Sequence, residues 1–145
     1  MALATAKSFI KYLNASPSPW HAVSEAATVL KANGYKELCE ASTTPWSLQR
    51  GEKYFIRRHG SCLFAFAIGG KFEPKTTGRF AMIGAHTDSP CIRIKPVSKI
   101  ERTKFLQIGV ECYGGGTWPT WLDRDLRMAG RVNYRGLTIY LSTFL

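Results

Sequence analysis

Long apolar runs are absent from this 145-residue sequence. No stretch reaches the roughly eighteen apolar residues that a membrane-spanning helix needs, so a transmembrane helix is excluded and no membrane partner is expected. The first seven residues also lack the basic start and apolar core of a secretory signal. We expect the first turn of an amphipathic helix there, and an organelle-targeting segment is the alternative.

Closely spaced cysteines are missing as well. No Cys-x-x-Cys pattern occurs, and this argues against a structural zinc site, because such sites use close ligand pairs. In a chain without a recognisable secretory signal we expect the cysteines to be buried, reduced thiols. The four cysteines are Cys39, Cys62, Cys91 and Cys112.

Acidic residues are scarce, with 10 against 20 lysines and arginines, for a formal charge of +10. Such an excess raises the question of a nucleic-acid partner. The basic residues are dispersed over expected turns and strand edges and do not form one stripe, so we predict no specific nucleic-acid partner. A second explanation is that the acidic part of a larger, electrically balanced protein is not included.

The composition that remains is that of a folded domain. Hydrophobic residues make up 45% of the chain and aromatic residues 12%, which predicts a globular domain with a real core. Apolar residues at helical spacing predict a first helix over 4–13. A second helix is expected over 20–33, with Ser18 as its N-cap, Pro19 at the first helical position and Gly34 as its stop.

Beyond Gly34 the pattern changes to that of strands. The first two expected strands form a hairpin, and the third is a buried central strand. Together with the helices they predict an α/β fold, a mixed sheet flanked by helices. The expected strands cover residues 53–59, 62–68, 80–85, 91–97 and 105–112.

The end of the 80–85 strand carries the most informative residues. His86 and Asp88 follow two small residues, and Pro90 then turns the chain away. A histidine at the carboxyl end of a strand can direct a ring nitrogen into a cleft, where open α/β sheets place their sites. An aspartate two positions later can accept the other ring N–H and fix the tautomer that a metal needs. His-x-Asp by itself is a common pattern. The expected strand before it and Pro90 after it make a functional role more plausible here.

The glycine-rich segment 113–126 is the second unusual stretch. Its three glycines allow a close approach of another backbone, but their spacing is not that of a nucleotide-binding loop. Trp118 and Trp121 would bury large areas, and the Asp-Arg-Asp run at 123–125 would form charge-assisted pairs. We assign no catalytic role to this segment. His21 is interpreted as part of a capped helix entry and not as a catalytic residue.

These stretches together resemble the M18 family of zinc metallopeptidases, the aspartyl aminopeptidases. The likeness rests on Ser-Pro-Ser-Pro-Trp-His-Ala-Val at 16–23, Ile-Gly-Ala-His-Thr-Asp-Ser-Pro at 83–90, and the glycine-rich segment with its continuation to Val132. It extends in the right order from about residue 5 to residue 132. One departure is Pro119, at a position where the family commonly has histidine or a small polar residue.

The resemblance implies the N-terminal portion of a co-catalytic zinc peptidase domain, with two zinc ions in the complete protein. It implies that His86 is a metal ligand and that Asp88 orients it. It further implies peptide substrates with N-terminal aspartate or glutamate, assembly of the full-length form into homo-oligomers, and a cytoplasmic location, with the vacuole or plastid as alternatives.

The resemblance also sets the expected boundaries. Family members are well over twice as long as this chain, so 1–132 is expected to be the N-terminal part of the catalytic domain. Residues 133–145 are expected to be a divergent tail, the product of truncation or splicing. Because most metal ligands would then be missing, we expect this chain alone to be inactive. The alternative is a non-catalytic short isoform that associates with full-length subunits as a regulatory or decoy fragment.

Overall fold

A computed structural model of the chain describes residues 2–76 and 78–144, and its first two elements are helices. They are α1 (Ala2–Ala15) and α2 (Pro19–Ala32), so both predicted helices are confirmed. Ser18 caps α2, since its hydroxyl accepts a hydrogen bond from the His21 backbone N–H, and Pro19 takes the first helical position. Gly34 ends the helix in the left-handed region, at φ 79°.

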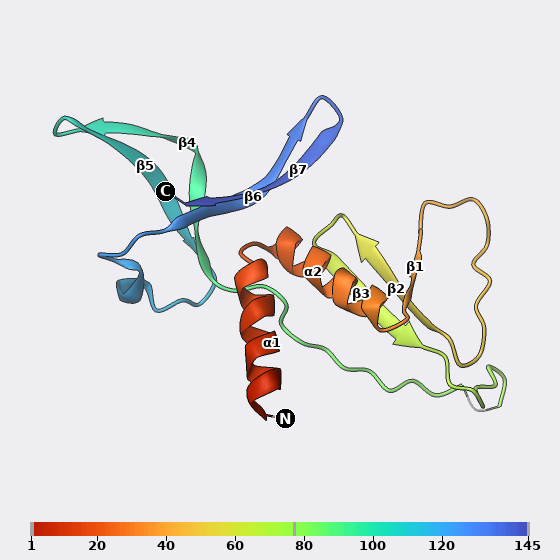
Figure 1. Cartoon of the computed structure of the whole chain (residues 1–145). Coiled ribbons are helices and arrows are strands. Elements are labelled where there is room, and N and C mark those ends of the chain that lie inside the picture. The colour runs from red at the N-terminus through yellow and green to blue at the C-terminus, as the bar shows by residue number, and fades with distance from the viewer. Residues whose placement is uncertain (1, 77, 145) are drawn as a thin grey trace.

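A three-stranded mixed sheet follows the helices (Figure 1). It consists of β1 (Lys36–Leu38), β2 (Lys53–Arg58) and β3 (Cys62–Ala67), in the order β1-β2-β3. β1 runs parallel to β2, and β2 pairs antiparallel with β3 as the predicted hairpin. The expected α/β class with a mixed sheet is therefore confirmed.

The core lies between α2 and this sheet. Phe55 of β2 is completely buried, and Val23 of α2 is 2% exposed. Ala22, Ala27 and Tyr54 complete the set of buried hydrophobic residues in the described part of the chain. α1 contributes no buried residue and touches α2, where the Tyr12 hydroxyl donates to the Ala22 carbonyl oxygen at 3.3 Å. The apolar side of α1 is exposed.

Two long hairpins make up the rest of the fold and extend away from the sheet (Figure 1). The first joins β4 (Cys91–Arg102) to β5 (Phe105–Tyr113), and the second joins β6 (Arg127–Tyr134) to β7 (Leu137–Phe144). Each tip is a two-residue turn with positive φ at both positions, the geometry that suits the twist of paired strands. The short helix η1 (Trp118–Trp121) connects the two hairpins.

The strand predicted over 80–85 is not formed. This segment has no secondary structure and belongs to the extended link between β3 and β4. Phe80, Met82 and Ile83 are 81%, 91% and 97% exposed, so the prediction of a buried central strand is wrong. An apolar run forms a strand only where a neighbour pairs with its backbone groups, and the described residues supply no such neighbour here.

The cysteines also differ from expectation. All four are free, as predicted, but Cys39, Cys62 and Cys112 are exposed and Cys91 is half-buried. Cys91 and Cys112 belong to the β4–β5 hairpin, whose two faces are both largely open. A two-stranded ribbon cannot bury both of its faces, which explains why these thiols are accessible.

The β6–β7 hairpin contacts the helix and sheet part of the molecule. A guanidinium N–H of Arg131 donates to the His59 carbonyl oxygen at 2.9 Å, and the same guanidinium lies 4.9 Å from the centre of the Trp20 ring. Tyr140 of β7 contacts the ring of His21. These contacts hold the hairpin against the start of α2. No helix in the described residues is long and apolar enough to cross a membrane.

Candidate metal-binding segment and neighbouring cleft

His86 lies on the link between β3 and β4, which Figure 1 shows as a coil passing close to α1. Its Nδ1 atom is 2.8 Å from the backbone carbonyl oxygen of Asp88 and 3.2 Å from the Asp88 carboxylate oxygen Oδ1. The structure thus brings the two predicted site residues together, with the histidine ring turned toward the aspartate. The strand expected to carry them is absent.

This geometry determines where the imidazole proton lies. Both neighbours of Nδ1 are hydrogen-bond acceptors, so Nδ1 carries the proton and donates it. The lone pair is then on Nε2, and the His86 side chain is 81% exposed. A neutral imidazole with one nitrogen held by a carboxylate and the other open is the arrangement found in metal-ligating histidines. His86 is therefore suited to donate Nε2 to a metal ion.

The donor set as a whole does not fit a complete zinc site. Within the described residues, no group of three or more histidine, cysteine, aspartate or glutamate side chains is arranged to hold a metal ion. Catalytic zinc usually has three protein ligands, and this segment offers one with its orienting carboxylate.

His21 has a different environment. Its Nδ1 lies 2.7 Å from the Ser18 hydroxyl oxygen, the same oxygen that accepts the His21 backbone N–H. The Ser18 hydroxyl thus contacts both the backbone and the ring of His21. Burial lowers the pKa of His21 from its usual 6.5, in agreement with a neutral ring. These contacts assign His21 to the helix entry, as the sequence indicated.

The glycine-rich segment is closely packed at two places. Gly114 has φ 87°, and a Cβ atom there would lie 3.3 Å from Pro90. The expected close approach of another backbone is therefore present, and it joins this segment to the link that carries His86. Trp118 and Trp121 lie side by side, with ring centroids 6.2 Å apart.

The charge-assisted network expected for Asp123, Arg124 and Asp125 is not formed. In the described part of the chain no ion pair involves any of the three, and all three are exposed. Asp123 has φ 54°, in the left-handed region, so the run follows an irregular turn.

A cleft of about 770 Å³ opens between the α1–α2 connection, the link after His86 and the loop after η1. Sequence reasoning did not find it, because its walls come from three segments that are distant along the chain. The sequence did contain one indication, since each of the three segments belongs to one of the stretches that resemble the family, at 16–23, 83–90 and 113–126. The cleft is lined by Tyr12, Leu13, Ser16, Pro17, Ser18, Pro19, Thr87, Ser89, Pro90, Cys91, Trp121, Arg124, Asp125, Leu126 and Arg127.

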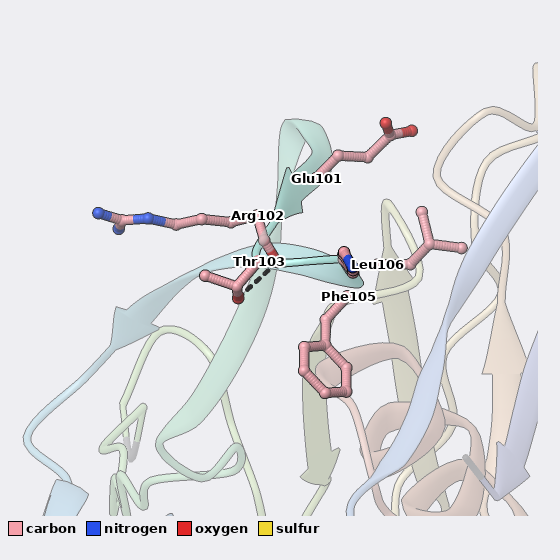
Figure 2. Close-up of a pocket in the computed structure, with 6 residues that line it drawn as sticks. Glu101, Arg102, Thr103, Phe105 and Leu106 are labelled. Carbon is pink, nitrogen blue, oxygen red and sulfur yellow. Dashed lines mark hydrogen bonds between the residues drawn. The ribbon is translucent and has the colours of Figure 1, made fainter.

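A second hollow, of about 270 Å³, lies at the tip of the β4–β5 hairpin (Figure 2). The side chains of Glu101 and Arg102 point in opposite directions from the ribbon, and the Thr103 hydroxyl donates to the Arg102 carbonyl oxygen at 2.7 Å. Polar groups do not converge there, so this hollow lacks the features of a binding site.

A mixed sheet with helices, together with an exposed histidine whose Nδ1 contacts an aspartate, would suit part of a metal-dependent hydrolase. Comparison with known proteins identifies the group. The family profile described as aminopeptidase I zinc metalloprotease (M18) matches residues 12–139. The chain belongs to this family of zinc aminopeptidases.

Individual relatives agree with the family. The chain is 48% identical over 130 residues to an aspartyl aminopeptidase of Dictyostelium discoideum, covering 90% of this chain and 26% of that protein. It is 49% identical over 126 residues to aspartyl aminopeptidase 4 of Saccharomyces cerevisiae, covering 87% of this chain and 25% of that protein. The chain thus spans about a quarter of the length of the curated relatives it matches.

Solved structures show the same relationship. A cryo-EM structure of an Ape4 and Nbr1 complex matches with a TM-score of 0.83 and 41% identity, over 97% of this chain and 27% of that chain. The structure of Chaetomium thermophilum mApe1 matches with a TM-score of 0.81 and 31% identity, over 96% of this chain and 32% of that chain. The arrangement of helices, sheet and hairpins is therefore that of the corresponding part of M18 aminopeptidases.

Proposed function

We propose that this chain is the N-terminal part of an M18 aminopeptidase domain and contributes His86 as one ligand of its metal centre. The observation that carries this proposal is the contact between the His86 Nδ1 atom and Asp88, which leaves Nε2 open. In the complete protein the metal centre would hold two zinc ions. When bound, zinc would polarise the carbonyl group of the substrate and lower the pKa of the attacking water. Asp88 keeps the imidazole in the metal-binding tautomer.

The substrates of the complete protein are peptides with an N-terminal aspartate or glutamate. This part of the proposal is supported by the relatives, which are aspartyl aminopeptidases at 48% and 49% identity.

The complete protein forms a homo-oligomer and acts in the cytoplasm. Residues 1–132 belong to the catalytic domain, and residues 133–145, which include β7, form the divergent tail. The isolated 145-residue chain does not hydrolyse peptides, because its described residues offer no group of three or more metal-ligating side chains.

The first test is hydrolysis of an aspartyl-amide substrate by the purified chain, with added zinc and with a chelator. We expect no chelator-sensitive activity. The second arm fuses residues 1–132 to the remaining sequence of the Dictyostelium relative, with which the chain is 48% identical. We expect zinc-dependent aspartyl-amide hydrolysis by this chimera, and its loss on His86→Ala.

A matched control is His59→Ala in the same chimera. His59 lies in the turn between β2 and β3 and not on the link that carries His86, so its substitution should leave most of the activity. Zinc-dependent activity of the isolated chain, or a fully active His86→Ala chimera, would show that the ligand assignment is wrong.

A second candidate function is that of a non-catalytic short form that binds full-length subunits. The exposed side chains of Phe80, Met82 and Ile83 favour it, because an unpaired apolar segment can add a strand to another chain. Co-purification of the tagged chain with a co-expressed full-length relative separates the two candidates. The short-form function requires a stable complex that alters the activity of the full-length subunits.

A further inference from the structure

We propose that Gly114 is a positioning residue of the candidate metal centre, because its contact with Pro90 holds the link that carries His86 and Asp88 in place. The inference rests on the proposed role of His86 as a metal ligand and adds to that site a residue from a distant part of the chain. It is carried by the close packing of Gly114 against Pro90 and by the place of both residues at the base of the β4–β5 hairpin.

Gly114 faces Pro90 without space for a side chain. A Cβ atom at Gly114 would lie 3.3 Å from both the Cα and the Cβ atoms of Pro90 and 3.5 Å from its Cγ atom. Unbonded carbon atoms usually lie about 3.5–4.0 Å apart, so a methyl group at position 114 would push Pro90 away. Gly114 also has φ 87°, which residues with a side chain rarely adopt. Two independent features therefore require glycine at this position.

The register of the hairpin explains why these two residues meet. Cys91 of β4 pairs with Tyr113 of β5, which is the first pair of the ladder after the link. Pro90 precedes Cys91 and Gly114 follows Tyr113, so they occupy the next opposite positions. The Arg93 guanidinium lies 3.3 Å from the centre of the Tyr113 ring and adds a cation–π contact at the same end. The base of the hairpin is thus a fixed point for the chain that enters it.

The segment that follows Gly114 is closely packed as well. A Cβ atom at Gly116 would lie 2.8 Å from a ring carbon of Trp118, so the indole rests against the Gly116 backbone. Gly115, between these two glycines, has open space where its Cβ would be. On the opposite side of the contact, the link before Pro90 has no secondary structure. A displacement at the contact is therefore taken up by the link.

Pro90 transmits its position to the histidine–aspartate pair over a short, stiff stretch. The proline ring fixes its own φ, and the residue before a proline is restricted to extended conformations, which limits Ser89. The Asp88 carbonyl oxygen that lies 2.8 Å from the His86 Nδ1 atom belongs to the peptide bond between Asp88 and Ser89. Moving Pro90 therefore changes the direction of this carbonyl group. Metal sites require their ligands to be placed within about 0.5 Å, so a small displacement is sufficient to disturb the site.

The experiment compares Gly114→Ala with Gly115→Ala in the 145-residue chain, without added metal. Gly115→Ala is the matched control, because it makes the same change one residue away, where a Cβ meets no atom within 4 Å. The first readout is the tautomer of the His86 ring, from nitrogen-15 shifts at about pH 9. We expect Gly114→Ala to move part of the population from the Nδ1-protonated form to the other form. Gly115→Ala should leave the populations unchanged.

The second readout is the motion of the link on the picosecond-to-nanosecond timescale. Nitrogen-15 relaxation gives backbone order parameters, which are about 0.85 for rigid amides and below about 0.6 for flexible ones. We expect the amides of residues 86–89 to fall from the rigid toward the flexible value in Gly114→Ala. The amides of α2 and β2 should keep their values in both variants. A general loss of structure would lower the values there as well, which separates it from a loss of positioning.

Two further variants separate the contact with Pro90 from the backbone conformation of Gly114. Asparagine tolerates positive φ better than alanine and carries the same Cβ atom, so Gly114→Asn should disturb the His86 ring as much as Gly114→Ala. Pro90→Ala removes the Cγ atom and the fixed φ from the other side of the contact and should loosen the same residues to a smaller extent. Because Gly114 is unchanged in Pro90→Ala, this variant tests the contact even if Gly114→Ala does not fold.

Three results would each overturn the proposal. They are an undisturbed His86 ring and link in both Gly114→Ala and Pro90→Ala, equal effects of Gly114→Ala and Gly115→Ala, and a clearly milder effect of Gly114→Asn than of Gly114→Ala. The peptidase test has a separate outcome. An active His86→Ala chimera would remove the ligand assignment even where Gly114→Ala disturbs the ring. An inactive one, with an undisturbed ring in Gly114→Ala, would keep the ligand and remove the positioning role.

Discussion

The ring of Tyr140 meets the imidazole of His21 edge-on, with ring centroids 5.8 Å apart and an interplanar angle of 61°. Tyr140 belongs to β7, and His21 lies in the first turn of α2, so residues 119 positions apart are in contact. Edge-to-face packing is a favoured geometry for aromatic pairs. The Tyr140 hydroxyl also comes close to Gly60, at 3.2 Å from where a Cβ would stand. The β6–β7 hairpin is thereby attached to the helix and sheet part of the molecule.

Replacing Tyr140 by alanine should loosen this attachment. We expect a loss of about 1 kcal/mol in the free energy of unfolding, the typical contribution of an aromatic pair. Backbone amides of β6 and β7 should exchange faster, as measured by native-state hydrogen exchange. Tyr134→Ala is the control, because Tyr134 lies on the same hairpin and is 61% exposed. If both variants lose the same protection, the contact with His21 has no specific role.

The stability of the protein should depend on pH through His21. Burial lowers the pKa of His21 from 6.5, so the unfolded chain binds a proton more readily than the folded one. The contribution of His21 to stability is therefore complete above the unfolded pKa and declines as the pH falls through and below it. Urea unfolding between about pH 7.5 and pH 5 should show this decline. His21→Gln should reduce this decline.

Phe55 should be the most sensitive position of the core. It is 0% exposed, and truncation to alanine would leave a cavity between β2 and α2. We expect Phe55→Ala to cost about 3–5 kcal/mol in urea unfolding. Phe64→Ala is the matched control, because Phe64 lies in the neighbouring strand and is 56% exposed. Its cost should be less than half as large, and equal costs would place the core elsewhere.

The exposed apolar segment should promote self-association of the isolated chain. Met82 is 91% exposed and Ile83 97% exposed in a stretch without a pairing strand. A charged residue in such a segment opposes strand pairing between molecules. We expect Met82→Lys to raise the concentration at which light scattering detects aggregates. Leu106→Lys, a substitution at an exposed residue of β5 that pairs with Glu101 of β4, should have a smaller effect.

The His86 ring should occupy the tautomer with the proton on Nδ1. Neutral histidine exchanges between two tautomers, and the 2.8 Å contact with the Asp88 carbonyl oxygen selects one. Nitrogen-15 shifts of the ring, recorded at about pH 9 where free imidazole is neutral, report the tautomer directly. Asp88→Ala removes the carboxylate and should shift part of the population to the other form. A ring with its proton on Nε2 would contradict the metal-ligand assignment.

Much of the local structure could be predicted from the sequence. Ser18, Pro19 and Gly34 act through their own backbone and side-chain preferences, so the limits of α2 follow from residues within it. The β2–β3 hairpin follows from alternating apolar residues around a glycine-containing turn. The proximity of His86 and Asp88 is likewise local, since a single residue, Thr87, separates them. The family resemblance rests on the same short stretches.

The rest required the tertiary structure, because it depends on which distant segments meet. The apolar run at 80–85 predicts a buried strand, yet it remains unpaired. Pairing requires a second strand alongside it, and the run itself does not supply one. Cys91 and Cys112 are accessible for a related reason: the β4–β5 hairpin that carries them has two largely open faces. The cleft with Arg124 and Ser16 forms where three remote segments converge, and no periodicity in the sequence reports that convergence. Sequence thus determined the two helices, the β2–β3 hairpin and the histidine–aspartate pair, and tertiary contacts decided burial, the pairing of residues 80–85 and the shape of the cleft.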